Sequence, residues 1–182
     1  MHRRALFRNF ILIYAGATVI PACIHDEKKS ALTLKNLRVG EDQEATLEAL
    51  AETIIPQTQT DSPGAGALGS HLFVLMMVDE CRTPKEQENF MKGFDRFMNL
   101  AKEKMGTGFL QASPAQRTAF LQEVEKKDNM PGELISFYLT TKHLTIQSYT
   151  SSEYFLTKVQ LYDMVPGRWH GCYPIKTNSA NG

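Results

Sequence analysis

Residues 83–106, TPKEQENFMKGFDRFMNLAKEKMG, contain the strongest structural signal in this 182-residue chain. The stretch opens as a helix start, because Thr83 can cap free amides, Pro84 suits the first helical position and Glu86 can bond back to the cap. Apolar side chains then recur at helical spacing until Gly106. They are Phe90, Phe94, Phe97, Met98, Ala101 and Met105. The stretch predicts a long amphipathic helix that packs one face on a core.

The segments on either side of this helix have the same spacing of apolar residues. Helices are predicted at 42–55, 68–81, 113–128 and 132–149. A capping box at 150–153 predicts a sixth helix that runs through Phe155, Val159 and Tyr162. No run alternates apolar and polar residues long enough to indicate a sheet. The sequence therefore predicts an all-α fold, a single compact domain of about six helices with an irregular, aromatic C-terminal segment that packs back on them.

The N-terminus has the order of a secretory signal. Three arginines precede an apolar stretch at 10–20, which is followed by Pro21, Ala22 and Cys23. The apolar stretch covers about half of a ~30 Å hydrocarbon core, so a permanent membrane span is not expected. Ile20 to Cys23 resembles a lipobox, apart from Pro21, and predicts lipidation of Cys23. The pair Arg3 and Arg4 resembles a twin-arginine export motif, and the general and twin-arginine export routes both stay open.

These signals divide the chain into four parts. We expect a signal peptide at 1–22, a lipidated polar tether at 23–40, a helical domain at 41–176 and a tail at 177–182. Residues 1–22 contain three arginines and no acidic residue. The chain without them has 17 Lys and Arg residues and 20 Asp and Glu residues, which gives a net charge of −3. The two signs are interspersed, so no nucleic-acid partner is indicated.

The cysteines agree with export. If Cys23 carries lipid, Cys81 and Cys172 remain as an even pair, and a disulfide between them is the favoured interpretation. The alternative is two free buried thiols, which pack as small apolar residues.

Catalytic and cofactor motifs are weak. No histidine has a second ligand at a spacing typical of a metal site, and His143 is interpreted as a structural histidine beside core positions. Gly64, Gly66 and Gly69 match a GxGxxG pattern, but no strand precedes them, as a dinucleotide site requires. We predict no catalytic, cofactor-binding or metal-binding residue in this chain.

Aromatic residues crowd the last third of the chain, and this residue type is enriched in protein interfaces. They are Tyr149, Tyr154, Phe155, Tyr162, Trp169 and Tyr173. They either form a partner-binding surface or complete the small core, and both interpretations stay open.

Four segments together resemble the gluconate 2-dehydrogenase subunit 3 family. They are DSPGA at 61–65, FMKGFD at 90–95, YTSSE at 149–153 and PGRWHGC at 166–172. The resemblance implies a small exported subunit of a periplasmic, flavin-dependent sugar or sugar-acid dehydrogenase. The FAD would lie in a separate large subunit of the glucose-methanol-choline oxidoreductase type, and electrons often leave through a cytochrome c.

By resemblance, the chain is expected to be a non-catalytic accessory subunit that supports export, folding or membrane attachment of the large flavoprotein. The expected location is the periplasmic side of a bacterial envelope, with a lipid anchor. The expected partner interface consists of Pro63, Gly64, Tyr149, Ser152, Glu153, Arg168 and Trp169. Two alternative functions stay open: a free-standing helical lipoprotein that binds another envelope protein, and an enzyme in its own right, which would hold a cofactor or metal in the isolated chain.

Overall fold

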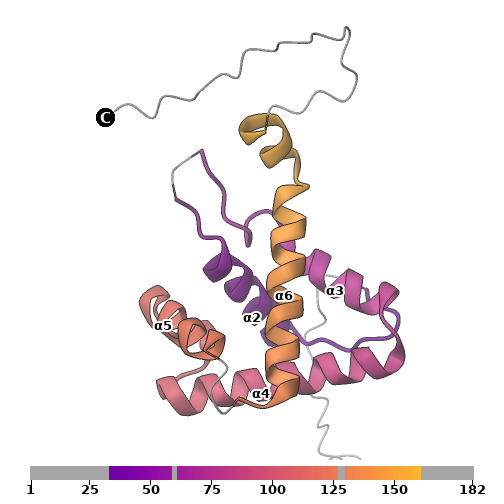
Figure 1. Cartoon of the computed structure of the whole chain (residues 1–182), viewed down its shortest axis with the longest axis vertical. Helices are drawn as coiled ribbons and strands as arrows, with labels where there is room; N and C mark the ends of the chain where they lie inside the picture. The colour runs from indigo at the N-terminus through magenta and orange to yellow at the C-terminus, as the bar shows by residue number, and fades with distance from the viewer. Residues whose placement is uncertain (1–32, 59–60, 127–129, 161–182) are drawn as a thin grey trace, which may run out of the picture.

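The computed structural model describes residues 33–58, 61–126 and 130–160, and this part of the chain is all-α, as predicted (Figure 1). The predicted signal peptide, Cys23 and the C-terminal aromatic segment lie outside the described residues. The helices are α2 (Glu41–Ile54), α3 (Ser70–Cys81), α4 (Pro84–Met105), α5 (Pro114–Glu125) and α6 (Gly132–Thr150), with short segments η1 (Phe109–Gln111) and η2 (Phe155–Val159).

The start of α4 confirms the capping pattern in the sequence. The Thr83 hydroxyl accepts a hydrogen bond from the Glu86 amide at 3.4 Å, and the Thr83 amide donates to the Glu86 carboxylate at 2.9 Å. Ser113 and Gln116 repeat the arrangement at the start of α5. Because both caps satisfy amides that have no partner within their helix, they fix where α4 and α5 begin.

The centre of the fold is the crossing of α6 over α4 (Figure 1). The Phe137 ring of α6 stacks on Phe94 with centroids 4.8 Å apart and also contacts Phe90 and Phe97. Gly93 allows this approach, since a Cβ at Gly93 would lie 2.3 Å from the Glu133 carbonyl oxygen and 2.6 Å from the Phe137 Cβ. The phenylalanine stripe is therefore core, as the sequence predicts.

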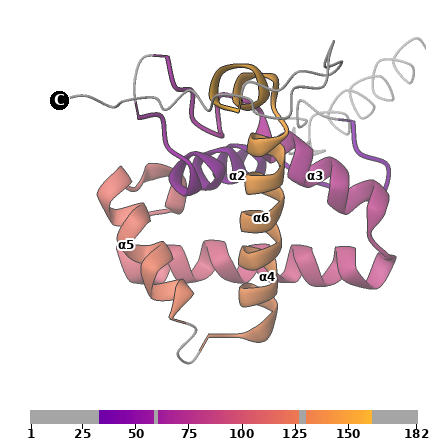
Figure 2. The same ribbon diagram turned by 45° about the horizontal axis from the view of Figure 1, so that its top comes forward.

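The other helices surround this crossing. Figure 2 shows α2 and α3 on opposite sides of α6, with α4 running across below them. Phe109 of η1 and Phe120 of α5 extend the aromatic core, with centroids 5.1 Å and 5.3 Å from the Phe97 ring. Of the predicted sixth helix, the described residues contain Glu153 and Tyr154 in helical conformation and the five-residue π-helix η2 after them. The Ser152 hydroxyl accepts a hydrogen bond from the Phe155 amide at 3.2 Å, whereas the Thr150 hydroxyl donates back to the Ile146 carbonyl oxygen of α6.

Residues 33–40 differ from the polar tether that the sequence predicts. The buried Asp79 carboxylate accepts hydrogen bonds from the backbone amides of Lys35, Asn36 and Leu37 at 2.8, 2.8 and 2.7 Å. Leu37 is buried in the hydrophobic core. Burial raises the pKa of Asp79, but the hydrogen bonds from the three amides lower it more. The pKa of Asp79 therefore lies below the ordinary value of an aspartate, and the carboxylate stays charged to a lower pH. The last part of the predicted tether is thus fastened to the domain.

Candidate functional site

The structure brings together two segments of the predicted partner interface that lie 86 residues apart. The Tyr149 hydroxyl, at the end of α6, donates a hydrogen bond to the Pro63 carbonyl oxygen at 3.3 Å. The half-buried Tyr149 ring also meets Tyr154 and Phe155, with centroids 6.4 and 6.0 Å away. These contacts form a half-buried aromatic cluster where the loop before α3 meets the end of α6.

The other predicted interface residues have different surroundings. The Ser152 hydroxyl donates to the Tyr149 carbonyl oxygen at 2.7 Å and accepts from the Phe155 amide, so it shapes the turn into η2. Glu153 is exposed. Arg168 and Trp169 lie outside the described residues.

Gly64 is buried beneath this surface. A Cβ at Gly64 would lie 2.2 Å from both carboxylate oxygens of Glu52, whose Oε2 accepts a hydrogen bond from the Gly66 amide at 3.0 Å. The chain's own carboxylate therefore occupies the place where a phosphate would meet a glycine-rich loop. These residues do not fit the pyrophosphate of a bound flavin, and the loop's glycines are explained by close packing.

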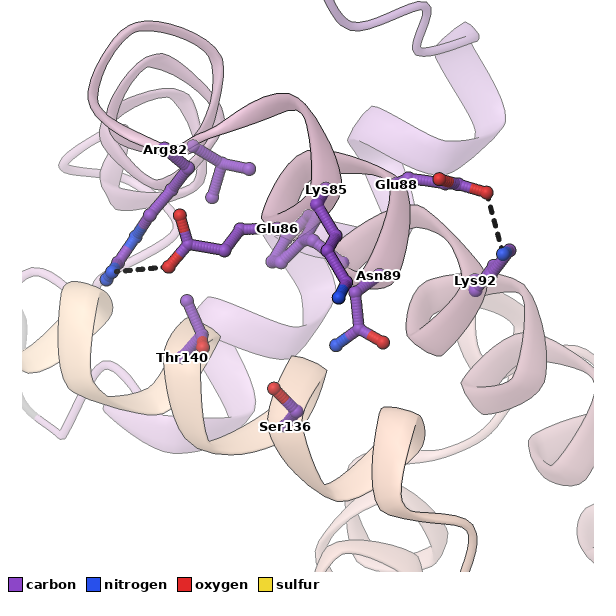
Figure 3. A pocket seen from close by; sticks show the side chains of 10 residues that line it. Arg82, Lys85, Glu86, Glu88, Asn89, Lys92, Ser136 and Thr140 are labelled. Carbon is purple, nitrogen blue, oxygen red and sulfur yellow. Dashed lines mark ion pairs between the residues drawn. The ribbon is translucent and has the colours of Figure 1, made fainter.

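A groove of about 380 Å³ opens where the end of α3 and the start of α4 face α6 (Figure 3). Buried Val78 and Phe90 form part of its lining, with Ser136 and Thr140 of α6 on the opposite side. Its rim is charged. Arg82 pairs with Glu86 at 3.8 Å and Lys92 pairs with Glu88 at 2.7 Å.

Lys85 is the remaining cation of this groove and forms no ion pair within the described part of the chain; Figure 3 shows its side chain beside Asn89. Three cations therefore face two carboxylates here. The groove is suited to an anionic side chain of another molecule, because Lys85 and the amide of Asn89 are available as donors.

A second polar cluster joins α5 to α6. The Tyr138 hydroxyl donates to Glu125 at 2.6 Å, and the Lys142 ammonium bonds to the same oxygen. Lys142 and Tyr138 hold the pKa of Glu125 below its ordinary value, while burial and Glu125 raise the pKa of Tyr138. Tyr138 therefore stays protonated and the cluster acts as a fastener between helices. Sequence reasoning missed it, although Tyr138 and Lys142 are one helical turn apart.

The two histidines in the described residues, His71 and His143, are not grouped with other metal ligands. His71 is buried with no hydrogen-bond partner for Nδ1 in the described residues, and burial lowers its pKa although Glu48 and Glu44 partly oppose the shift. His143 is exposed, so its interpretation as a structural histidine is wrong. Within the described ranges no three His, Cys, Asp or Glu residues are grouped as metal ligands.

The predicted disulfide is not tested. Cys81 is a free, exposed thiol at the end of α3, and Cys172 lies outside the described residues. The pairing stays a prediction. None of the described helices combines the length and the apolar character that a membrane span needs.

Comparison with protein families matches residues 41–167 to the family model described as gluconate 2-dehydrogenase subunit 3. The match covers most of the chain and includes all five α-helices described above. Comparisons with curated proteins and with solved structures gave no match. The matched range also contains the Pro63 loop, the groove and the Tyr149 cluster. The chain belongs to the gluconate 2-dehydrogenase subunit 3 family.

Proposed function

We propose that this chain is a non-catalytic accessory subunit of an envelope flavin-dependent sugar or sugar-acid dehydrogenase. The observation that carries the proposal is the family match over residues 41–167, because the family is that of a dehydrogenase subunit. The FAD and the reacting atoms would then belong to a large flavoprotein subunit of the glucose-methanol-choline oxidoreductase type, and a cytochrome c would take the electrons.

Two features of the described residues support the proposal that the FAD and the reacting atoms belong to another subunit. The glycine-rich loop is filled by Glu52, so it does not offer its amides to a cofactor phosphate. The cluster of Tyr138, Glu125 and Lys142 pairs internally and fastens α5 to α6.

The N-terminal residues give the proposed subunit its route and location. The signal sequence at 1–22 would direct export of the chain together with its folded partner, and a lipid on Cys23 would attach the complex to the periplasmic side of a membrane. The helical domain would begin soon after the anchor, since residues 35–37 are already fastened to Asp79.

The test is purification of the full chain from its native membranes through a C-terminal tag. We expect a larger chain to co-purify, and the material to show flavin absorbance. A colourless single chain, obtained under conditions that preserve other envelope complexes, would overturn the proposal and favour a free-standing lipoprotein.

A further inference from the structure

The outward side of α6 has two of the four large apolar side chains that are exposed in the described residues. We define the outer face of α6 as the exposed or half-exposed side chains that point away from the core. They are Ile135, Ser136, Leu139, His143, Ile146, Gln147 and Thr150. Leu139 and Ile146 are 43% and 41% exposed, which is high for large apolar side chains. Ile135, Leu139 and Ile146 follow one another at helical spacing and form an apolar strip.

This outer face lacks formal charge. In α6 the only Asp, Glu, Lys or Arg residues are Glu133 and Lys142, and each is paired with a neighbouring helix, through Arg96 and Glu125. By contrast, α4 has nine charged residues among its 22. Interface centres are depleted of charge relative to ordinary protein surface, so the composition of α6 is typical of a face that another protein covers.

The outer face of α6 alone is too small for a stable interface, whichever protein covers it. A helix of 19 residues is ~28 Å long, and with a width of about 10 Å its face offers roughly 300 Å². A stable interface buries about 800 Å² on each partner. The occupant must therefore also contact the elements at the ends of α6.

Both ends of the outer face have features that extend the surface. At the N-terminal half, Ser136 and Thr140 continue into the groove, where Lys85 lacks an ion-pair partner among the described residues (Figure 3). At the C-terminal end lies the cluster of Tyr149 with Tyr154 and Phe155. An occupant that fits would present an uncharged apolar strip, with an acidic side chain placed to reach Lys85.

We propose that the outer face of α6, with the groove at one end and the Tyr149 cluster at the other, binds the large flavoprotein subunit. This inference rests on the proposed function. Leu139 and Ile146 form the centre of the interface and Lys85 pairs with a carboxylate of the partner.

The test compares tagged full-length chains by the amount of flavoprotein each recovers from native membranes. The double variant Leu139→Lys and Ile146→Lys is expected to recover at least about tenfold less, because it puts two charges at the centre of the interface. Lys85→Glu, on the exposed start of α4, is expected to recover about fivefold less, since it repels the partner's carboxylate. The control is Ala119→Lys, which adds the same charge at an exposed position of α5.

The outcomes separate the inference from the proposed function. If the unmodified chain recovers no flavoprotein, the proposed function fails. If it does, but Lys85→Glu and the double variant recover as much as Ala119→Lys, the interface inference is overturned and the proposed function stands. Circular dichroism checks that the variants stay helical, and Lys85→Glu keeps the test valid if the double variant unfolds.

Two further measurements identify a different occupant. Trp169 is the sole tryptophan of the chain. A red shift of its fluorescence in the isolated double variant would show that the chain's own C-terminal segment covers the face. A dimeric isolated chain that the double variant converts to a monomer would show a second copy there. Either result would overturn the inference.

Discussion

Replacing Asp79 tests how the domain holds the segment that leads to its N-terminal anchor. The carboxylate accepts three backbone hydrogen bonds from residues 35–37, and Asp79→Ala removes all of them. A hydrogen bond to a charged group contributes about 1.5–3 kcal/mol. The amides of exposed Lys35 and Asn36 can bind water instead, whereas that of buried Leu37 cannot without leaving the core. We therefore expect a loss of roughly 3–5 kcal/mol in the free energy of unfolding.

Asp79→Asn keeps one oxygen acceptor and loses the charge, so we expect about half of that loss. The assay is urea denaturation of the full mature chain, combined with brief trypsin digestion. Detachment of the segment exposes the bonds after Lys35 and Arg38, which should be cut faster in Asp79→Ala. The matched control is Glu80→Gln, which removes the exposed Lys35–Glu80 ion pair and should change neither readout.

The effect should also depend on pH. Because the pKa of Asp79 is lowered in the folded state, its contribution is complete above its unfolded value of about 4 and is lost as the pH falls through the folded pKa. Unfolding free energies of Asp79→Ala within about 1 kcal/mol of the unmodified chain, with unchanged trypsin cleavage, would refute the reasoning.

Three further predictions concern the core and the interface cluster. Gly93→Ala forces a Cβ against the Glu133 carbonyl oxygen and should lower the free energy of unfolding by about 1–3 kcal/mol or more, measured by urea denaturation; an unchanged value would contradict the close crossing of α4 and α6. Burial lowers the pKa of His71, so its contribution to the free energy of unfolding should be complete above about pH 6.5 and should fall as the pH drops toward the folded pKa, by about 1.4 kcal/mol for each pH unit by which the pKa is lowered. Melting curves at pH 7.5 and 5.5 should show this loss of stability in the unmodified chain and not in His71→Gln. A pH dependence that persists in His71→Gln would assign it to other groups. Tyr149→Phe deletes the bond to Pro63 and should cost about 0.5–1.5 kcal/mol while loosening the loop to proteolysis, so a loop as resistant as before would count against that contact.

Local signals in the sequence predicted the helices well. Thr83, Pro84 and Glu86 define the start of α4 through contacts only three residues apart, and the phenylalanine stripe fixes which side of α4 is buried. Both features depend on short-range geometry that spacing alone reveals.

The parts that could not be predicted depend on distant contacts. The amides of residues 35–37 bind a carboxylate 42 to 44 residues away, so the segment appeared to be a tether. A signal was present in Asp79 itself, an acidic residue near the end of a mostly apolar helix, where the helix dipole disfavours negative charge. The groove likewise forms only when α3, α4 and α6 meet, and no stretch of sequence contains it.

The predicted partner interface stays a prediction, although the structure shows how some of its residues lie. Tyr149 and Pro63 do meet, but Gly64 is enclosed by Glu52, and the uncharged outer face of α6 was not recognised. Leu139 and Ile146 share one side of α6 at helical spacing, but both are exposed, so the periodicity alone did not show which side of this helix faces the core. The proposed interface would explain why these apolar side chains of α6 are exposed in the isolated chain.

The measurement that tests the accessory role most directly is the amount of flavin-loaded large subunit in the envelope of cells with and without this chain. The account predicts that the large subunit is lost from the envelope when the chain is missing and returns when the chain is supplied from a plasmid. A large subunit that is exported, loaded with flavin and retained at the membrane without this chain would contradict it.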